Sequence, residues 1–201
     1  MSDGFNRMPE IYDNLKKLEE NRLVIGVPWS NQHLNMIALV QEYGKTIRPV
    51  SRQWLTLPTP AANGKRPKDF NNLFFISKAP DKAYLAMKDP GKQSGIVPMF
   101  ILRKSVVIPP RPFIRNTFDH KLDDWTKYAG ELALGIIAGD LSVDDFYKRL
   151  GDQVVKDLTA AIKQFDSPKN APLTVANKGF DDPLVDSGKL RDSIIWIKER
   201  N

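Results

Sequence analysis

The sequence predicts an α+β protein in which a mixed or antiparallel sheet with a β-meander insertion packs against two long helices. Up to about residue 108, short apolar runs alternate with turn residues, which is typical of strands. After residue 118, apolar residues recur at spacings of three and four over two long stretches. A strand-like run at residues 194–197 is expected to join the same sheet as the meander and must therefore pair with strands formed much earlier, so we expect a single α+β domain over residues 1–201.

The first forty residues predict a helix, a strand and a second helix. Residues 8–20 carry apolar side chains at helical spacing, and Pro9 suits a first helical turn. Residues 22–28 favour a strand that ends at its proline. Helical spacing returns over residues 34–43, and Gly44 follows where a helix commonly ends in a left-handed residue.

The next part of the chain predicts the meander. A short strand is expected around residues 54–57, a hairpin from residues 73–77 and 83–87, and a third strand over residues 96–108. Residues 58–95 are interpreted as a basic hairpin and loop insertion, because prolines, glycines and basic residues dominate their connections.

A proline-rich arm then joins the sheet to the helices. Pro109, Pro110 and Pro112 lack an N–H donor, so sheet pairing must stop here. Asn116 is the predicted N-cap of the following helix, and an extended arm would place Phe113 among charges. The arm either reaches across a subunit interface or packs on its own sheet. The candidate interface residues are Arg103, Lys104, Arg111, Pro112, Phe113 and Arg115.

The two long helices are expected to pack antiparallel, with their apolar stripes in the core. The first should end at Gly139, and Ser142 with Asp145 predicts the N-cap of the second. Each stripe is interpreted as core rather than as an interface.

Charge is distributed unevenly along the chain. Between Lys45 and Arg115 there are 14 Lys and Arg against 3 Asp and Glu, whereas the whole chain carries a net charge of +6. This part is either an ordinary solvated surface or a surface that faces nucleic acid or an acidic partner. Its exposed loop contributes the candidate DNA-facing residues Lys65, Arg66 and Lys68.

Signatures of catalysis are few. The chain has no cysteine and two histidines, and it lacks a Gly-rich phosphate loop, so no catalytic, cofactor or metal site is expected. The residues Asp119, His120, Asp123 and Asp124 could bind a divalent cation, but acidic residues in a first helical turn more simply favour the helix dipole. Neither a secretory signal nor a membrane-spanning helix is expected.

Three segments resemble a known family. Residues 108–115, Ile-Pro-Pro-Arg-Pro-Phe-Ile-Arg, resemble the "IPARPF" signature of neck and tail-completion proteins of tailed bacteriophages. Residues 37–44 are similar to the "hEFG" segment of that family, and residues 184–194 to its closing "LIDTGxLRxSI". The chain departs from the pattern at Pro110, where the family has a small residue, and at Tyr43, where phenylalanine is usual.

The resemblance implies a non-enzymatic structural protein of the virion, assembled in the host cytoplasm and located in the neck or at the top of the tail. It implies a homo-oligomeric ring, a hexamer or a dodecamer, around the DNA channel. Its partners would be head-completion or connector proteins and tail terminator or tube proteins, with nonspecific contact to genomic DNA and none to a membrane. The alternatives are a tail terminator that caps the tube, a basic DNA-binding accessory protein outside the virion, and a metal-dependent nuclease built on the acidic residues.

Overall fold

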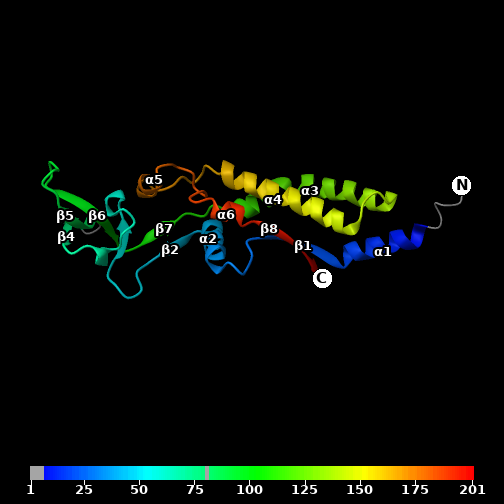
Figure 1. The fold of residues 1–201 in the computed structure, drawn as a ribbon, viewed down its shortest axis with the longest axis horizontal. Coiled ribbons are helices and arrows are strands. Elements are labelled where there is room, and N and C mark those ends of the chain that lie inside the picture. Colours follow the sequence, from blue (N-terminus) through cyan, green and yellow to red (C-terminus); the bar gives the residue numbers. More distant parts are fainter. Residues whose placement is uncertain (1–6, 80–81) are drawn as a thin grey trace. The chain divides into compact units, whose positions relative to one another are not determined.

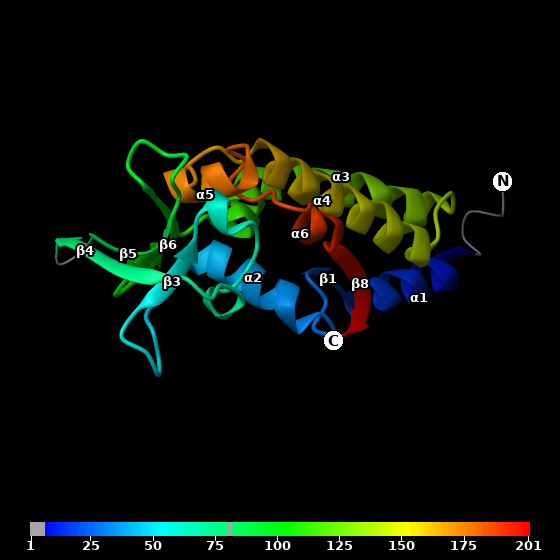
Figure 2. The same ribbon diagram turned by 60° about the vertical axis from the view of Figure 1, so that its left-hand side comes forward.

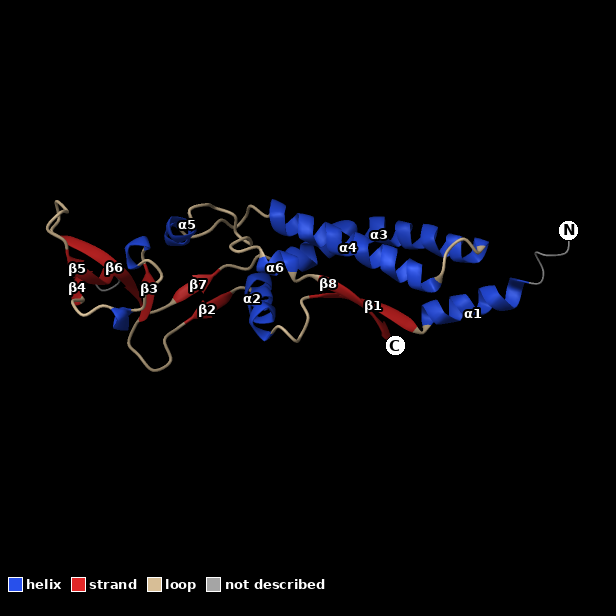
Figure 3. Ribbon diagram, viewed as in Figure 1, coloured by secondary structure: helices blue, strands red, loops and turns tan. Residues whose placement is uncertain are grey.

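The computed structural model describes residues 7–79 and 82–201 and has the predicted α+β fold of helices and antiparallel sheets (Figures 1 and 3). The chain divides into two compact units. Unit 1 comprises Met1–Glu42, Arg111–Phe165 and Leu184–Asn201, and unit 2 comprises Tyr43–Pro110 and Asp166–Pro183. The predicted insertion at residues 58–95 lies within unit 2.

Unit 1 is mainly helical. Its helices are α1 (Met8–Glu19), α2 (Gln32–Tyr43, whose last residue belongs to unit 2), α3 (Phe113–Ala138), α4 (Val143–Gln164) and the short α6 (Lys189–Asp192). The two long helices, α3 and α4, lie side by side and antiparallel, as predicted (Figures 1 and 2). Gly139 ends α3 in a left-handed conformation, and the Ser142 hydroxyl accepts a 3.1 Å hydrogen bond from the backbone N–H of Asp145. Both predicted helix boundaries are therefore confirmed.

A two-stranded sheet covers one side of α4. In it, β1 (Asn21–Gly26) pairs antiparallel with β8 (Ile195–Arg200), and Val24 lies opposite Ile197. Trp196 packs on α4 at Gly151, where a Cβ would lie 2.4 Å from Cδ2 of the indole. A side chain at position 151 would therefore displace the indole, and glycine allows the sheet to approach the helix closely.

The prediction that the C-terminal strand joins the same sheet as the meander is wrong. Among the described residues, β8 pairs only with β1, and these strands form their own sheet. The strand identity was readable from its apolar run, but its partner depends on the packing of Trp196 against α4, which local sequence does not reveal.

Unit 2 is built around a four-stranded antiparallel sheet. Its strands are β3 (Leu55–Pro58), β4 (Phe74–Ala79), β5 (Lys82–Lys88) and β6 (Ile96–Arg103), in the order β3-β6-β5-β4. The predicted meander of three consecutive strands is confirmed; the tip of its hairpin, residues 80–81, lies outside the described residues. Phe100 is buried under this sheet and packs edge-to-face on Phe70, with ring centroids 5.8 Å apart.

The predicted third strand over residues 96–108 is wrong in one respect, because it is two strands in two sheets. Whereas β6 pairs with β3 and β5, β7 (Val106–Ile108) pairs with β2 (Lys45–Ile47). The exposed residues Lys104 and Ser105 separate the two, so no buried side chain holds the chain straight there. The remaining elements of unit 2 are η2 (Pro60–Ala62), η3 (Pro67–Asp69) and α5 (Pro172–Lys178).

Candidate functional site

The end of the proline arm packs on α2 of its own chain. The backbone N–H of Arg111 donates to the carbonyl oxygen of Gln41 at 2.5 Å, and Nη1 of the Arg111 side chain donates to Oε1 of Gln41 at 2.9 Å. Only 5% of the surface of Arg111 is exposed. The end of the arm therefore packs on a helix of its own chain, whereas the sequence had left open its own sheet or a neighbouring subunit.

The carboxylate of Glu42 caps the N-terminus of α3. Its two oxygens accept hydrogen bonds from the backbone N–H groups of Ile114 and Arg115, both at 3.1 Å, and from Nε of Arg115 at 2.9 Å. Nη2 of Arg115 also donates to the carbonyl oxygen of Glu42 at 2.8 Å. These bonds satisfy N–H groups that a helix start otherwise leaves unpaired, and they place a negative charge at the positive end of the dipole.

The predicted N-cap at Asn116 is therefore wrong. Helix α3 begins at Phe113, three residues before Asn116, which lies inside it. Sequence reasoning missed Glu42 because a cap is normally sought within a few residues of the helix start. The available signal was that Glu42 is the one Asp, Glu, Lys or Arg among the twelve residues of α2. The structure shows it buried, with 4% of its surface exposed.

The three segments that carry the family resemblance meet in one core. Phe113 is 1% exposed and belongs to the same buried cluster as Ala38 from α2 and Leu184, Leu190 and Ile194 from the C-terminal segment. We call this cluster the motif core. The sequence predicted an extended arm with Phe113 among charges, and this prediction is wrong. Phe113 begins a helix, and the first turn of that helix buries its ring.

Unit 2 carries most of the basic excess. It contains 14 Lys and Arg against 6 Asp and Glu, a net charge of +8, whereas unit 1 contains 16 against 18, a net charge of −2. Lys65, Arg66 and Lys68 are all exposed, as an electrostatic surface requires. Their local fold is fixed: the backbone N–H of Arg66 donates to Asp69 at 2.8 Å, and the Lys65 ammonium lies 5.8 Å from the centre of the Phe70 ring.

The other interface candidates differ in their surroundings. Arg103 is half-buried at the end of β6, where its Nη1 donates to the carbonyl oxygen of Leu102 at 3.2 Å. Lys104 is exposed, and its ammonium lies 5.8 Å from the centre of the Trp54 ring. Pro112 is half-buried immediately before α3, and Arg115 projects to the surface with its guanidinium held by Glu42.

The acidic residues near the start of α3 are exposed. Asp124 accepts a hydrogen bond from the Lys121 ammonium at 2.9 Å, and Nδ1 of His120 lies 2.5 Å from the carbonyl oxygen of Asn116. Within residues 7–79 and 82–201, no group of three or more His, Cys, Asp or Glu is arranged to hold a metal ion.

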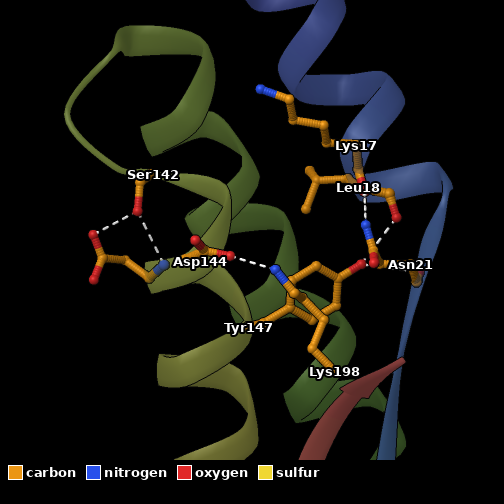
Figure 4. Close-up of polar contacts among 8 residues, drawn as sticks. Lys17, Leu18, Asn21, Ser142, Asp144, Tyr147 and Lys198 are labelled. Atoms are coloured by element: carbon orange, nitrogen blue, oxygen red, sulfur yellow. Dashed lines mark hydrogen bonds and ion pairs between the residues drawn. The ribbon is translucent and has the colours of Figure 1, made fainter. Parts of the chain in front are cut away.

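A polar crevice of about 600 Å³ is lined by residues that include Lys17 of α1, Asp144 of α4 and Lys198 of β8. Figure 4 shows the polar contacts among these elements. The hydroxyl of Tyr147 donates to the carbonyl oxygens of Leu18 and Asn21, both at 2.9 Å, and burial raises the pKa of this hydroxyl. The Lys198 ammonium donates to Asp144. This hydrogen bond, and then the charge of the ammonium, lowers the pKa of the Asp144 carboxyl below its usual 3.8. The contacts join three elements of unit 1 and have a structural role.

The Asp144 contact gives a pH prediction. A carboxyl whose pKa is lower in the folded chain adds stability above the unfolded value of 3.8 and loses it as pH falls through the folded value. Replacing Asp144 by asparagine should therefore lower the urea midpoint of unfolding at pH 7, and the difference from wild type should shrink as the pH falls below 3.8 and the carboxylate becomes protonated. Asp13→Asn is the control, because Asp13 has no ion-pair partner among the described residues; a difference that persists in acid would contradict the assignment.

An apolar groove of about 390 Å³ is the feature that sequence reasoning did not foresee. It lies in unit 1, lined by Leu23 and Ile25 of β1, by Phe118, Leu122 and Thr126 of α3, and by Leu150 and Val154 of α4. Phe118 and Leu122 were interpreted as core residues of a helical stripe, yet they are 50% and 43% exposed. The apolar stripe of α3 therefore extends beyond the buried core, and its residues Phe118 and Leu122 remain partly exposed to solvent.

No protein-family model, curated protein or solved structure matches the chain. In the part of the chain that the structure describes, no helix combines the length and apolar character needed to cross a bilayer.

Proposed function

We propose that the protein is a structural component of a tailed-phage virion that forms a homo-oligomeric ring around the DNA channel and joins tail to head. The observation that carries this proposal is the motif core. Three sequence segments that resemble one family contribute to a single buried cluster, and Glu42 of the first segment caps the helix that the second segment begins. Segments that matched by chance would have no reason to interlock.

The charge distribution supports a place beside DNA. A net charge of +8 on unit 2 would attract phosphates without reading base sequence, as suits a channel through which any genome sequence passes. The same charge favours the second candidate, a DNA-binding accessory protein outside the particle. A basic surface suits both the virion component and the DNA-binding accessory protein. The two candidates are therefore distinguished by whether the chain is found inside the particle.

Particle fractionation tests the proposal. In cells that assemble the phage with an epitope-tagged chain, the tag should sediment with complete particles at a fixed ratio to the tail-tube protein. A tag found only on free DNA, or absent from particles, would favour the accessory protein. Particles made with Lys65→Gln, Arg66→Gln and Lys68→Gln together should retain less DNA; full retention would show that attraction by this loop is unnecessary.

A further inference from the structure

The groove on unit 1 has an apolar floor and one exposed wall. Leu150, Val154 and Leu158 of α4 lie at its base, and the half-exposed Phe118 and Leu122 form its outer wall. Phe118 packs edge-to-face on Trp125, with ring centroids 6.2 Å apart, which fixes its position. Apolar side chains held open to solvent in this way are typical of a surface that another chain covers.

Two uncompensated carboxylates border that wall. Asp119 and Asp123 each follow a groove residue by one position, so they lie about 100° farther round α3, on its solvent side. Neither has an ion-pair partner among residues 7–79 and 82–201. Among the nearby basic residues of α3, Lys121 pairs with Asp124 and Arg115 pairs with Glu42. Lys127, one turn after Asp123, is exposed and has no ion-pair partner among the described residues. The groove is therefore apolar, and its rim carries the carboxylates of Asp119 and Asp123 against the single ammonium of Lys127.

A segment of unit 2 has the opposite character. Residues 48–54 connect β2 to β3 and project beyond the strands (Figure 2). Val50 is fully exposed between Arg48 and Arg52, which are exposed as well. Pro49 restricts its own φ and favours an extended Arg48, so this segment loses less conformational entropy on binding than an unrestrained loop would.

We propose that residues 48–54 of one copy dock into the α3 groove of a second copy, with Val50 against Phe118 and Leu122 and with Arg48 and Arg52 facing Asp119 and Asp123. Charge complementarity assigns the occupant: an apolar residue between two arginines fits an apolar groove with two free carboxylates on its rim. Each copy carries one groove and one loop, so the contact is heterologous and repeats from subunit to subunit. This contact would be the one that joins neighbouring subunits of the proposed ring. It rests on the proposed function, because it requires that copies of the chain associate.

Cysteine pairing tests this contact, because the natural chain contains no cysteine. Chains carrying Val50→Cys are mixed with chains carrying Thr126→Cys under a mild thiol oxidant. Both positions are exposed, so the substitutions should leave the fold intact. We expect a covalent heterodimer on denaturing gels, and a ladder of covalent oligomers from a chain that carries both substitutions.

Matched pairs control for random collision. Val107→Cys replaces Val50→Cys in one control, and Leu134→Cys replaces Thr126→Cys in the other; both positions are exposed and lie outside the loop and the groove. Linkage as rapid as in the test pair would overturn the inference, as would a doubly substituted chain that yields only an internally linked monomer.

Charge exchange gives an independent readout. Asp119→Arg with Asp123→Arg, or Arg48→Asp with Arg52→Asp, should each weaken self-association at least tenfold by mass photometry, and a mixture of the two variants should restore it. If wild-type rings form but these variants and cysteine pairs have no effect, the contact is wrong and the proposed function stands. If the contact forms but the chain is absent from particles, the proposed function is wrong and the contact stands.

Discussion

Replacing Glu42 by alanine should lower the free energy of unfolding of unit 1 by about 2 to 4 kcal/mol. The loss has two sources. Two backbone N–H groups at the start of α3 lose their acceptor, and the guanidinium of Arg115 loses its carboxylate. Because Arg115 is half-exposed, the ion pair itself adds little, and most of the effect comes from the cap. Urea unfolding followed by tryptophan fluorescence measures it, since three of the four tryptophans, Trp29, Trp125 and Trp196, lie in unit 1.

Two further substitutions define the source of that loss. Glu42→Gln keeps the side-chain volume and one carbonyl acceptor, so it should cost about half as much as Glu42→Ala. Asp13→Ala, on the exposed surface of α1, should change stability by less than about 0.5 kcal/mol. Equal effects of Glu42→Ala and Asp13→Ala would contradict the capping role.

Replacing Gly44 by alanine should destabilise the pairing of β2 with β7 by about 2 to 4 kcal/mol. Gly44 has φ +70°, where a Cβ is strained, and this Cβ would lie 2.8 Å from the backbone nitrogen of Pro110 and 2.9 Å from the carbonyl oxygen of Ile108. Backbone atoms of a paired strand cannot rotate away, so the strands must shift. Amide hydrogen exchange of residues 45–47 and 106–108 should accelerate by at least tenfold.

Gly64 provides the matched control for this substitution. It also has a positive φ, +73°, but a Cβ there would meet nothing within 4 Å. Gly64→Ala should therefore show only the backbone strain, about 1 to 2 kcal/mol. If the two alanine variants lose the same stability, the close approach of Gly44 to the proline arm does not contribute to the free energy of unfolding.

Much of the fold was predictable because its signals are local. Gly139 and the Ser142–Asp145 pair mark the turn between α3 and α4 within a few residues, and the meander follows from apolar runs with turns between them. Sheet membership was not predictable in the same way. Lys104 and Ser105 look like part of one strand, and only the pairing of Val106–Ile108 with Lys45–Ile47, some sixty residues earlier, divides it.

The candidate site shows the same division between local and distant signals. The basic character of unit 2 could be read from residue counts, and Lys65, Arg66 and Lys68 are exposed, as that interpretation requires. The cap of α3 could not be read locally, because Glu42 precedes Ile114 by 72 residues. Phe118 and Leu122 have helical spacing like that of core residues, and only the positions of β1 and α4 show that they border an open groove.

The position of the chain in an intact particle decides whether it joins tail to head. Cryo-electron microscopy of the assembled phage should show copies of this α+β fold in a closed ring at the head–tail joint, encircling the DNA channel. The fold is distinctive enough to recognise by the paired α3 and α4 helices and the four-stranded sheet of unit 2. Density elsewhere in the particle, or complete particles whose joint is built without this chain, would contradict the account.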